Sequence, residues 1–508
     1  MEKIVKKIIS CRVLYYILAM ILLVATYYLD LKAKLEQNSI EGNHLKYFII
    51  TSIISGIIIF LLIVFSKFMY KKIRPHIVYL ILALIVGSMY ILFIPLCAQS
   101  DEPAHMYRAF QVAKGEVIAP FTDGEPLTDL PKSLNDMIYV NSTDKKREYK
   151  KYYDIKEMSK IQLNEEETTK VATVANYHGI SYLPQVIGIK IGIILKLNPY
   201  YIAMLGRITG FILIILMFSF GIYKLPKHKL FASIVLLSPV VLSYAAGISA
   251  DGMTLASIFL LISYVLYFKE TKNNIKIYEY FILALLVFVV AISKIAYLPV
   301  IGILAFIPND CYKNNKKFKW IVSSIILLFG ICTAIWWMKT CNVNVEYSEN
   351  VDSNTWIYTN PLGYLIVLFR TTIYSWNMYL TDMFAGIFLC HKQVNPYDVV
   401  PFCYIIIAIL SFMHDENSEK TTTWQKIATT CIIIISYVLI STAMYVYNTA
   451  YRNEIIIGVQ GRYLVPLLML AVFFGNKKRI EVQENRLVNI ALIANYAVYL
   501  AMMTTFFA

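Results

Sequence analysis

Long apolar runs separated by short polar and basic segments extend along the whole chain. A hydrocarbon core of about 30 Å takes roughly 20 mainly apolar residues in a helix, and a helix satisfies its own backbone groups in lipid. We therefore expect helical spans rather than strands. The pattern predicts thirteen of them, at residues 13–29, 47–68, 76–97, 200–223, 230–248, 251–268, 277–292, 295–309, 319–338, 400–413, 427–447, 463–475 and 487–507.

The composition supports an all-α polytopic membrane protein. Of the 508 residues, 58% are hydrophobic and 16% are charged, whereas soluble domains carry roughly 25% charged residues. The net charge of +14 does not indicate a nucleic-acid partner, because the basic residues lie in short clusters between apolar runs. The eight cysteines form no C-x-x-C pair and lie mostly in or beside spans, so we expect them to pack as apolar residues.

Basic clusters orient the chain, because lysines and arginines in short loops stay cytoplasmic. Lys3, Lys6, Lys7 and Arg12 place the N-terminus in the cytoplasm. No small-residue cleavage site follows the first apolar run, so we expect a retained helix rather than a removed signal. Every later cluster then falls on the cytoplasmic side, at residues 67–74, 224–229, 269–276, 313–319, 420–426 and 477–486.

This orientation requires that the apolar segment 180–197, which contains Lys190 and Lys196, does not cross the membrane. We interpret it as a juxtamembrane or re-entrant helix at the outer surface, and we treat segment 361–389 in the same way. The expected divisions are N-terminal spans 1–97, a first outer loop 98–199, a bundle 200–338, a second outer loop 339–399 and C-terminal spans 400–508.

The sharpest local motif is SDEPAHMYR at residues 100–108, directly after the third predicted span. Two interpretations of its acids stay open. Ser100 or Asp101 can cap a helix that starts near Pro103. Alternatively, Asp101 or Glu102 is a general base, because two adjacent carboxylates at a membrane boundary are costly and tend to have a raised pKa.

Glu102 and His105 also have the E-x-x-H spacing that puts two metal ligands on one helix face. The chain contains no H-E-x-x-H motif. A divalent metal is therefore the less favoured interpretation, and we assign no metal ligands. His105 and Arg108 remain candidates for substrate binding because they lie in the same motif.

A second motif, GVQGRYLVP at residues 458–466, lies at the expected outer mouth of the twelfth span. Its two glycines allow backbone to approach a ligand closely, and Arg462 can hold a phosphate through paired hydrogen bonds. Gln460 and Tyr463 are candidates beside it. The alternative is that Arg462 and Tyr463 only anchor the helix at the membrane interface.

Two tight turns between spans carry charges that a turn does not require, Asp251 and Lys294. Lys294 is a further candidate for binding phosphate, as is Arg207 near the start of the fourth span. The acids and bases of these motifs are far apart in sequence, yet the orientation puts them all at one face. Together they describe a site for a phosphorylated lipid and a second substrate.

The strings DEPAHMYRAF at 101–110, ISADG at 248–252, SKIAYLP at 293–299 and GVQGRYLVPL at 458–467 resemble a bacterial membrane-protein family, domain of unknown function 2142. The layout is also similar to membrane glycosyltransferases of the GT-C class. Asp101 and Glu102 match the acidic pair of that class, His178 in HGISYLP falls where it often has a histidine, and Arg207 falls near its recurrent arginine. HGISYLP departs from the usual string of that class, and the large outer loop comes later in the chain.

The resemblance implies a bacterial plasma-membrane enzyme that moves a sugar from a polyprenyl-phosphate donor to a cell-surface glycan or lipid-linked acceptor at the outer face. Asp101 or Glu102 would deprotonate the acceptor hydroxyl, and Lys294, Arg462 and Arg207 would stabilise the departing phosphate. Two alternatives stay open: a flippase or exporter of lipid-linked glycans, and a polymerase or ligase that joins preassembled glycans.

Overall fold

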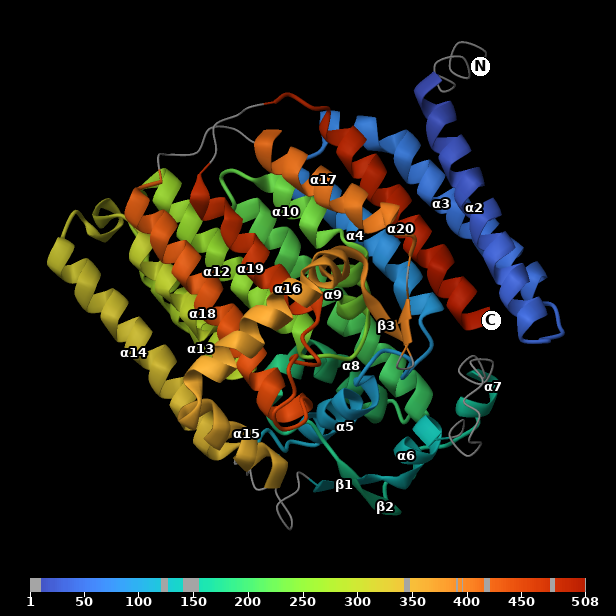
Figure 1. Ribbon diagram of the computed structural model, residues 1–508, viewed down its shortest axis with the longest axis horizontal. Helices are drawn as coiled ribbons and strands as arrows, with labels where there is room; N and C mark the ends of the chain where they lie inside the picture. The colour runs from blue at the N-terminus through green and yellow to red at the C-terminus, as the bar shows by residue number, and fades with distance from the viewer. Residues whose placement is uncertain are drawn as a thin grey trace.

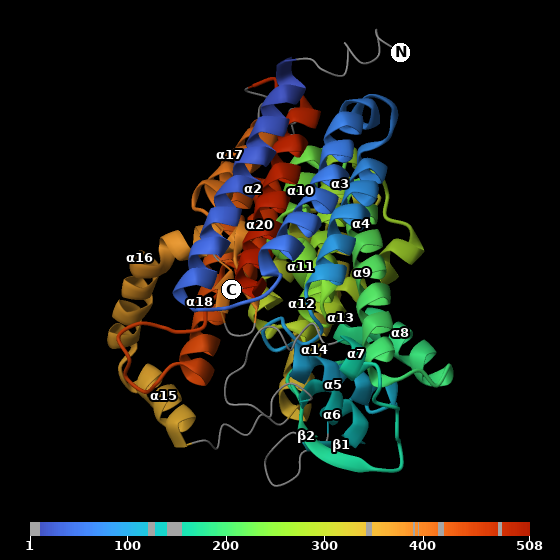
Figure 2. The same cartoon turned by 90° about the vertical axis from the view of Figure 1, so that its right-hand side faces the viewer.

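The computed structural model describes residues 11–119, 127–139, 155–341, 348–389, 392–394, 396–414, 421–475 and 480–507. Within these ranges, helices form one elongated bundle. The helix nearest the N-terminus begins at one end of the bundle, and a group of short helices and a β-hairpin covers the other end (Figure 1, Figure 2).

Eight helices of the described chain are long and apolar enough to cross a membrane. A ninth crossing results if α10 (Lys229–Leu236) and α11 (Pro239–Ala246), which meet at a bend of 60°, count as one span. Pro239 explains the bend, because proline has no N–H to continue α10 and suits the first position of α11. The eight are α2 (Cys11–Gln37), α3 (His44–Lys72), α4 (Pro75–Phe93), α9 (Pro199–Lys224), α12 (Asp251–Thr271), α14 (Lys316–Thr340), α18 (Thr423–Asn448) and α20 (Glu484–Phe507).

The polytopic helical architecture is therefore confirmed, but the number thirteen is not. The remaining four predicted spans correspond to shorter apolar segments: α13 (Ile277–Ser293), η3 (Ile295–Phe306), α17 (Val399–His414) and the run of η5 (Gly461–Leu464), α19 (Val465–Leu468) and η6 (Met469–Phe474). Two of them are largely 3₁₀ helix, with Pro299 inside η3 and Pro466 inside α19. A 3₁₀ helix rises about 2.0 Å per residue, so such segments cover more depth than their length suggests.

Buried polar contacts fix the most enclosed helices. Asn495 of α20 donates to the Leu237 carbonyl (2.9 Å) and accepts from the Tyr90 hydroxyl of α4 (3.0 Å). Tyr496 donates to the Ser52 carbonyl of α3 (2.8 Å). Because the hydrophobic effect does not drive helices together in lipid, such bonds add to the packing that holds them. α20 thereby holds α3, α4 and the bent pair together.

The first expected outer loop folds into a cap on the bundle end opposite the start of α2 (Figure 2). It contains α5 (Glu102–Ala113), β1 (Leu127–Pro131), α6 (Lys132–Tyr139), α7 (Ile155–Met158), β2 (Thr168–Ala172), η2 (Gly179–Tyr182) and α8 (Leu183–Ile194). β1 and β2 pair antiparallel, with Leu127 opposite Ala172. α8 has 12 residues and so rises about 18 Å, too little to cross a bilayer. This length agrees with a juxtamembrane role for segment 180–197.

The second expected outer loop contributes α15 (Ser348–Thr359), α16 (Pro361–Ala385), β3 (Ile387–Leu389) and β4 (Lys392–Val394). β3 pairs with β4 and also bridges to Gln99, so this hairpin reaches the residues just before α5. A last short helix, η4 (Asn309–Tyr312), connects η3 to α14. The two segments expected outside thus meet at one end of the molecule.

Candidate active site

Asp101 lies in the turn that leads from α4 into α5, and its side chain is 58% exposed. Its φ is 65°, a left-handed conformation that aspartate tolerates better than most residues. The side chain makes no capping hydrogen bond to α5, so the capping interpretation of Asp101 is wrong. The turn is fixed by its neighbours, because the Ser100 N–H donates to the Phe388 carbonyl (3.3 Å) and Gln99 pairs with Leu389.

Glu102, the adjacent acid, is buried and fully engaged. Its carboxylate accepts from Arg207 Nε (2.7 Å) and Nη2 (2.5 Å) and from the backbone N–H groups of Cys97 (2.9 Å) and Ile248 (3.1 Å). Arg207 donates its other bonds to two backbone carbonyls at the end of α4. The expectations that Glu102 acts as a base and that Arg207 holds a phosphate do not fit this geometry. The pair instead locks α5 to α9.

Arg108 is also a structural residue rather than the substrate ligand we expected. It is fully buried, and its guanidinium donates to the carbonyls of Tyr177 (3.2 Å), Glu116 (3.1 Å) and Val117 (2.5 Å) and to the Gln111 side chain (2.7 Å). These bonds tie α5 to the segments that precede β1 and η2. Four of its five N–H groups are thereby used within the protein.

Four charged side chains from separate parts of the chain form one cluster, which we call the charged cluster: Asp101, Asp251, Lys294 and Arg462. Lys294 Nζ lies 2.6 Å from Asp251 Oδ1, and Arg462 Nε lies 3.3 Å from Asp251 Oδ2. Arg462 Nη2 lies 4.0 Å from Asp101 Oδ2. Asp251 begins α12, Lys294 separates α13 from η3, and Arg462 belongs to η5. Asp251 therefore holds two cations side by side, with Asp101 at their exposed edge.

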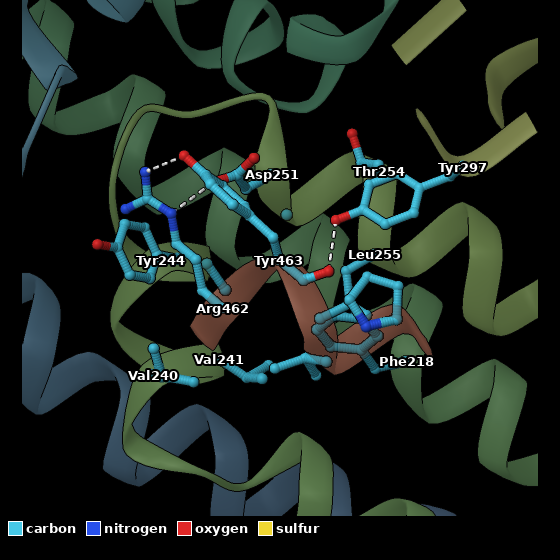
Figure 3. A pocket seen from close by; sticks show the side chains of 14 residues that line it. Phe218, Val240, Val241, Tyr244, Asp251, Thr254, Leu255, Tyr297, Arg462 and Tyr463 are labelled. Carbon is cyan, nitrogen blue, oxygen red and sulfur yellow. Dashed lines mark hydrogen bonds and ion pairs between the residues drawn. The ribbon is translucent and has the colours of Figure 1, made fainter. Parts of the chain in front are cut away.

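Aromatic rings lie beside both cations, and Figure 3 shows Tyr244 and Tyr463 beside Arg462. The Tyr463 ring lies 4.2 Å from Lys294 Nζ, and the Tyr244 ring lies 4.2 Å from Arg462 Cζ. Arg462 Nη2 donates to the Tyr463 hydroxyl (3.2 Å), and Tyr297 donates to the Tyr463 carbonyl (2.8 Å). Cations over ring faces are attracted by the ring quadrupole, most strongly where water is excluded.

Arg462 keeps unused donors although its side chain is only 10% exposed. Within the described chain Nη1 has no hydrogen-bond partner, and Nε meets Asp251 at ion-pair distance without hydrogen-bond geometry. A buried donor without a partner lowers the stability of the fold by about 1–3 kcal/mol. A ligand atom that accepts a hydrogen bond from Nη1 would remove this cost. An anion with two or more oxygens suits such a guanidinium.

A small pocket with a cavity volume of about 40 Å³ adjoins the charged cluster. Asp251, Arg462 and Tyr463 line this pocket, and the apolar side chains of Phe218, Val240, Val241 and Leu255 form much of the rest of its lining (Figure 3).

Comparison with known proteins bears on the whole region. Residues 84–471 match the model of a family described as predicted membrane protein, DUF2142. This range includes every candidate residue named above. The chain belongs to the DUF2142 family. No curated protein and no solved structure matches it. In this DUF2142 chain the site must therefore be interpreted from its own geometry.

The two candidate histidines of this DUF2142 protein lie in aromatic surroundings. His105 Nδ1 lies 2.6 Å from the Tyr182 hydroxyl, and its ring contacts Tyr177. Burial lowers the pKa of His105 to about 4, so the ring is neutral at pH 7. His178 accepts the Ile180 N–H and packs against Trp337 at 4.6 Å. These contacts fix the ring of His178 against Trp337, and its role in substrate binding stays a prediction.

Gln460, the residue before η5, has a buried Oε1 without a hydrogen-bond partner in the described chain. Its place beside Gly461 and Arg462 keeps it a candidate for substrate binding. No three His, Cys, Asp or Glu side chains of the described residues gather as metal ligands. The E-x-x-H pair also fails as a metal site, since Glu102 is saturated by Arg207 and His105 faces Tyr182.

Sequence reasoning missed the tyrosines that surround the DUF2142 charged cluster. Tyr244 precedes the ISADG string, Tyr297 lies within SKIAYLP, and Tyr177 lies 5.7 Å from Lys294 Nζ. The chain contains 39 tyrosines, so their residue type alone carries no signal. Nearness to a charged turn residue is the signal that identifies Tyr244 and Tyr297.

Proposed function

We propose that this protein is a membrane glycosyltransferase that moves a sugar from a polyprenyl-phosphate donor to a cell-surface glycan or lipid-linked acceptor at the outer face. The observation that carries the proposal is the convergence of Asp101, Asp251, Lys294 and Arg462 at a pocket with an apolar wall. The polar side suits the phosphate, and the apolar wall suits the first part of the lipid chain.

Lys294 and Arg462 bind the phosphate in this mechanism. Charge grows on the phosphate as its bond to the sugar breaks, and preorganised cations stabilise such charge most where water is excluded. Asp251 spaces the two cations and keeps them charged. The ring of Tyr463 limits the movement of the Lys294 side chain, and the ring of Tyr244 limits that of Arg462.

Asp101 is the base in this mechanism, because Glu102 is bound by Arg207. Its exposed carboxylate takes the proton of an acceptor hydroxyl while that oxygen forms a bond to the anomeric carbon. The bond from this carbon to the phosphate oxygen breaks, its electron pair stays on the phosphate, and polyprenyl phosphate leaves. A single displacement of this kind inverts the anomeric configuration.

Transfer is favoured over export because the charged cluster lies at helix ends. Asp251 is the first residue of α12, Lys294 directly precedes η3, and Arg462 lies in the short η5. A path for a glycan across the membrane needs polar groups at mid-depth. A polymerase or ligase would use the same cations and base, and the chemistry proposed here applies to either acceptor.

The test is the glycan composition of cells that carry Asp101→Asn in place of the wild-type chain. Loss of a general base costs roughly 10²–10⁴-fold in rate, so we expect the glycan of a deletion strain. Asp129→Asn is the matched control, since Asp129 is an exposed acid of the same cap. An Asp101→Asn strain with wild-type glycan and normal protein level would exclude Asp101 as the base.

A further inference from the structure

A second acidic residue, away from the charged cluster, is buried without a counter-charge. Asp382, near the end of α16, is 2% exposed. Its Oδ1 accepts a hydrogen bond from Gln393 Nε2 of β4 (2.5 Å), whereas its Oδ2 has no hydrogen-bond partner in the described chain. No basic side chain of the described residues forms an ion pair with it.

Asp382 lines a hollow with a cavity volume of about 70 Å³ at the junction of α16, β4 and the start of α17. Three other residues of this lining carry side-chain oxygens: Thr381, Gln393 and Asp398. Asp398 is exposed, so the hollow opens to the surface on its side. Gln393 donates its amide N–H to Asp382, which leaves the amide oxygen for another contact.

Taking an ionised carboxylate out of water without a partner costs so much that the group either holds a proton or binds a cation. Asp398 adds a second negative charge at the same hollow. A bound cation would offset the free energy that it costs to bury the charge of Asp382. It would also give a partner to Asp382 Oδ2, which has none in the described chain.

We propose that this hollow binds a divalent cation of the calcium class, with Asp382 and Asp398 as carboxylate ligands and neutral oxygens of Gln393 and Thr381 beside them. All four side chains offer oxygen, which hard cations prefer, whereas zinc prefers nitrogen and sulfur. Calcium accepts irregular geometry and completes its shell with water, and an open hollow suits this better than the near-ideal octahedron that magnesium demands.

The site adjoins the second motif without belonging to the charged cluster. A Cβ atom on Gly461 would lie 2.6 Å from the Asp382 Cβ and 2.4 Å from the Met383 nitrogen. The end of α16 therefore rests directly on the residue before Arg462. A cation at Asp382 would brace this contact whether or not the chain transfers sugars.

The test is equilibrium binding of radioactive calcium to the purified full chain in detergent, together with its thermal unfolding across a calcium titration. We expect one bound ion with a Kd in the range of roughly 10⁻⁴–10⁻³ M, typical of extracellular calcium modules. Asp398→Asn should weaken binding at least about tenfold. Asp129→Asn, an exposed acid of the cap, should bind as the wild type does.

Asp382→Asn separates loss of a ligand from loss of the fold. It should abolish both calcium binding and the rise in unfolding temperature with calcium. Without calcium it should unfold at or above the wild-type temperature, because the amide removes a buried acid. Calcium binding unchanged in both Asp382→Asn and Asp398→Asn would overturn the proposal, as would a wild-type chain that binds no calcium at millimolar concentration.

Discussion

Asp101 and Glu102 are neighbours in sequence, yet the fold gives them opposite roles. The basic loops predicted that both lie at the face that also holds Asp251, Lys294 and Arg462, and the structure brings Asp101 together with those three. The sequence could not separate the two acids, because the partner of Glu102 is Arg207, 105 positions away. Which carboxylate is bound and which is exposed depends on tertiary packing.

We expect a large loss of stability when one partner of the Glu102–Arg207 ion pair is replaced by a neutral residue. Both side chains are 1% exposed, and removal of one member of a buried ion pair costs about 3–5 kcal/mol because the other charge stays unpaired. Glu102→Gln should lower the free energy of unfolding by this amount in denaturant titrations in micelles. Adding Arg207→Met should restore part of the loss. Equal stability of Glu102→Gln and wild type would show that the pair carries no such role.

His105 predicts an acid-sensitive fold. Its folded-state pKa of about 4 is below the ordinary value of 6.5 because the ring is buried. The unfolded chain therefore binds a proton first as the pH falls, so stability is full above pH 6.5 and is lost progressively towards pH 4, by up to roughly 3 kcal/mol. His105→Gln should flatten this part of a plot of unfolding temperature against pH. An identical slope in the variant would contradict the assignment.

At the scale of elements, hydropathy located every apolar helix but overestimated how many cross as regular α-helices. Segments 295–309 and 463–475 become partly 3₁₀ helices, and segment 230–248 breaks at Pro239. Apolar composition does not distinguish a span from a short buried helix, since both avoid water. The close fit of η5 against α16 was invisible because it depends on one missing side chain, at Gly461.

We expect Gly461→Ala to lower the free energy of unfolding, because it disturbs the contact between η5 and α16. The new Cβ would lie 2.4 Å from the Met383 backbone nitrogen and 2.5 Å from the Tyr379 backbone oxygen. Backbone atoms cannot relieve such a clash by changing rotamer, as a side chain could. Overpacking of this kind costs typically about 1–3 kcal/mol, and the shift of η5 should displace Arg462 and lower activity. Gly302→Ala is the control, because its Cβ would meet nothing closer than 3.7 Å. Similar unfolding temperatures for the two variants would argue against a tight η5–α16 contact.

At the scale of the whole molecule, the two segments predicted to lie outside meet at the bundle end opposite the start of α2 (Figure 2). The cap and the β3–β4 hairpin hold Asp101, while α12 and η5 supply Asp251 and Arg462. The family match over residues 84–471 spans all of these parts and leaves out α2, α3 and α20. The site is thus assembled by the region that defines the family.

The most direct measurement is a structure of the purified chain with polyprenyl phosphate bound. The phosphate should lie within hydrogen-bond distance of Lys294 Nζ and Arg462 Nη1, with the first isoprene units against Val241 and Leu255 and with Asp101 at the open side. A phosphate bound elsewhere, with the charged cluster unchanged and unoccupied at a saturating lipid concentration, would contradict the proposed active site.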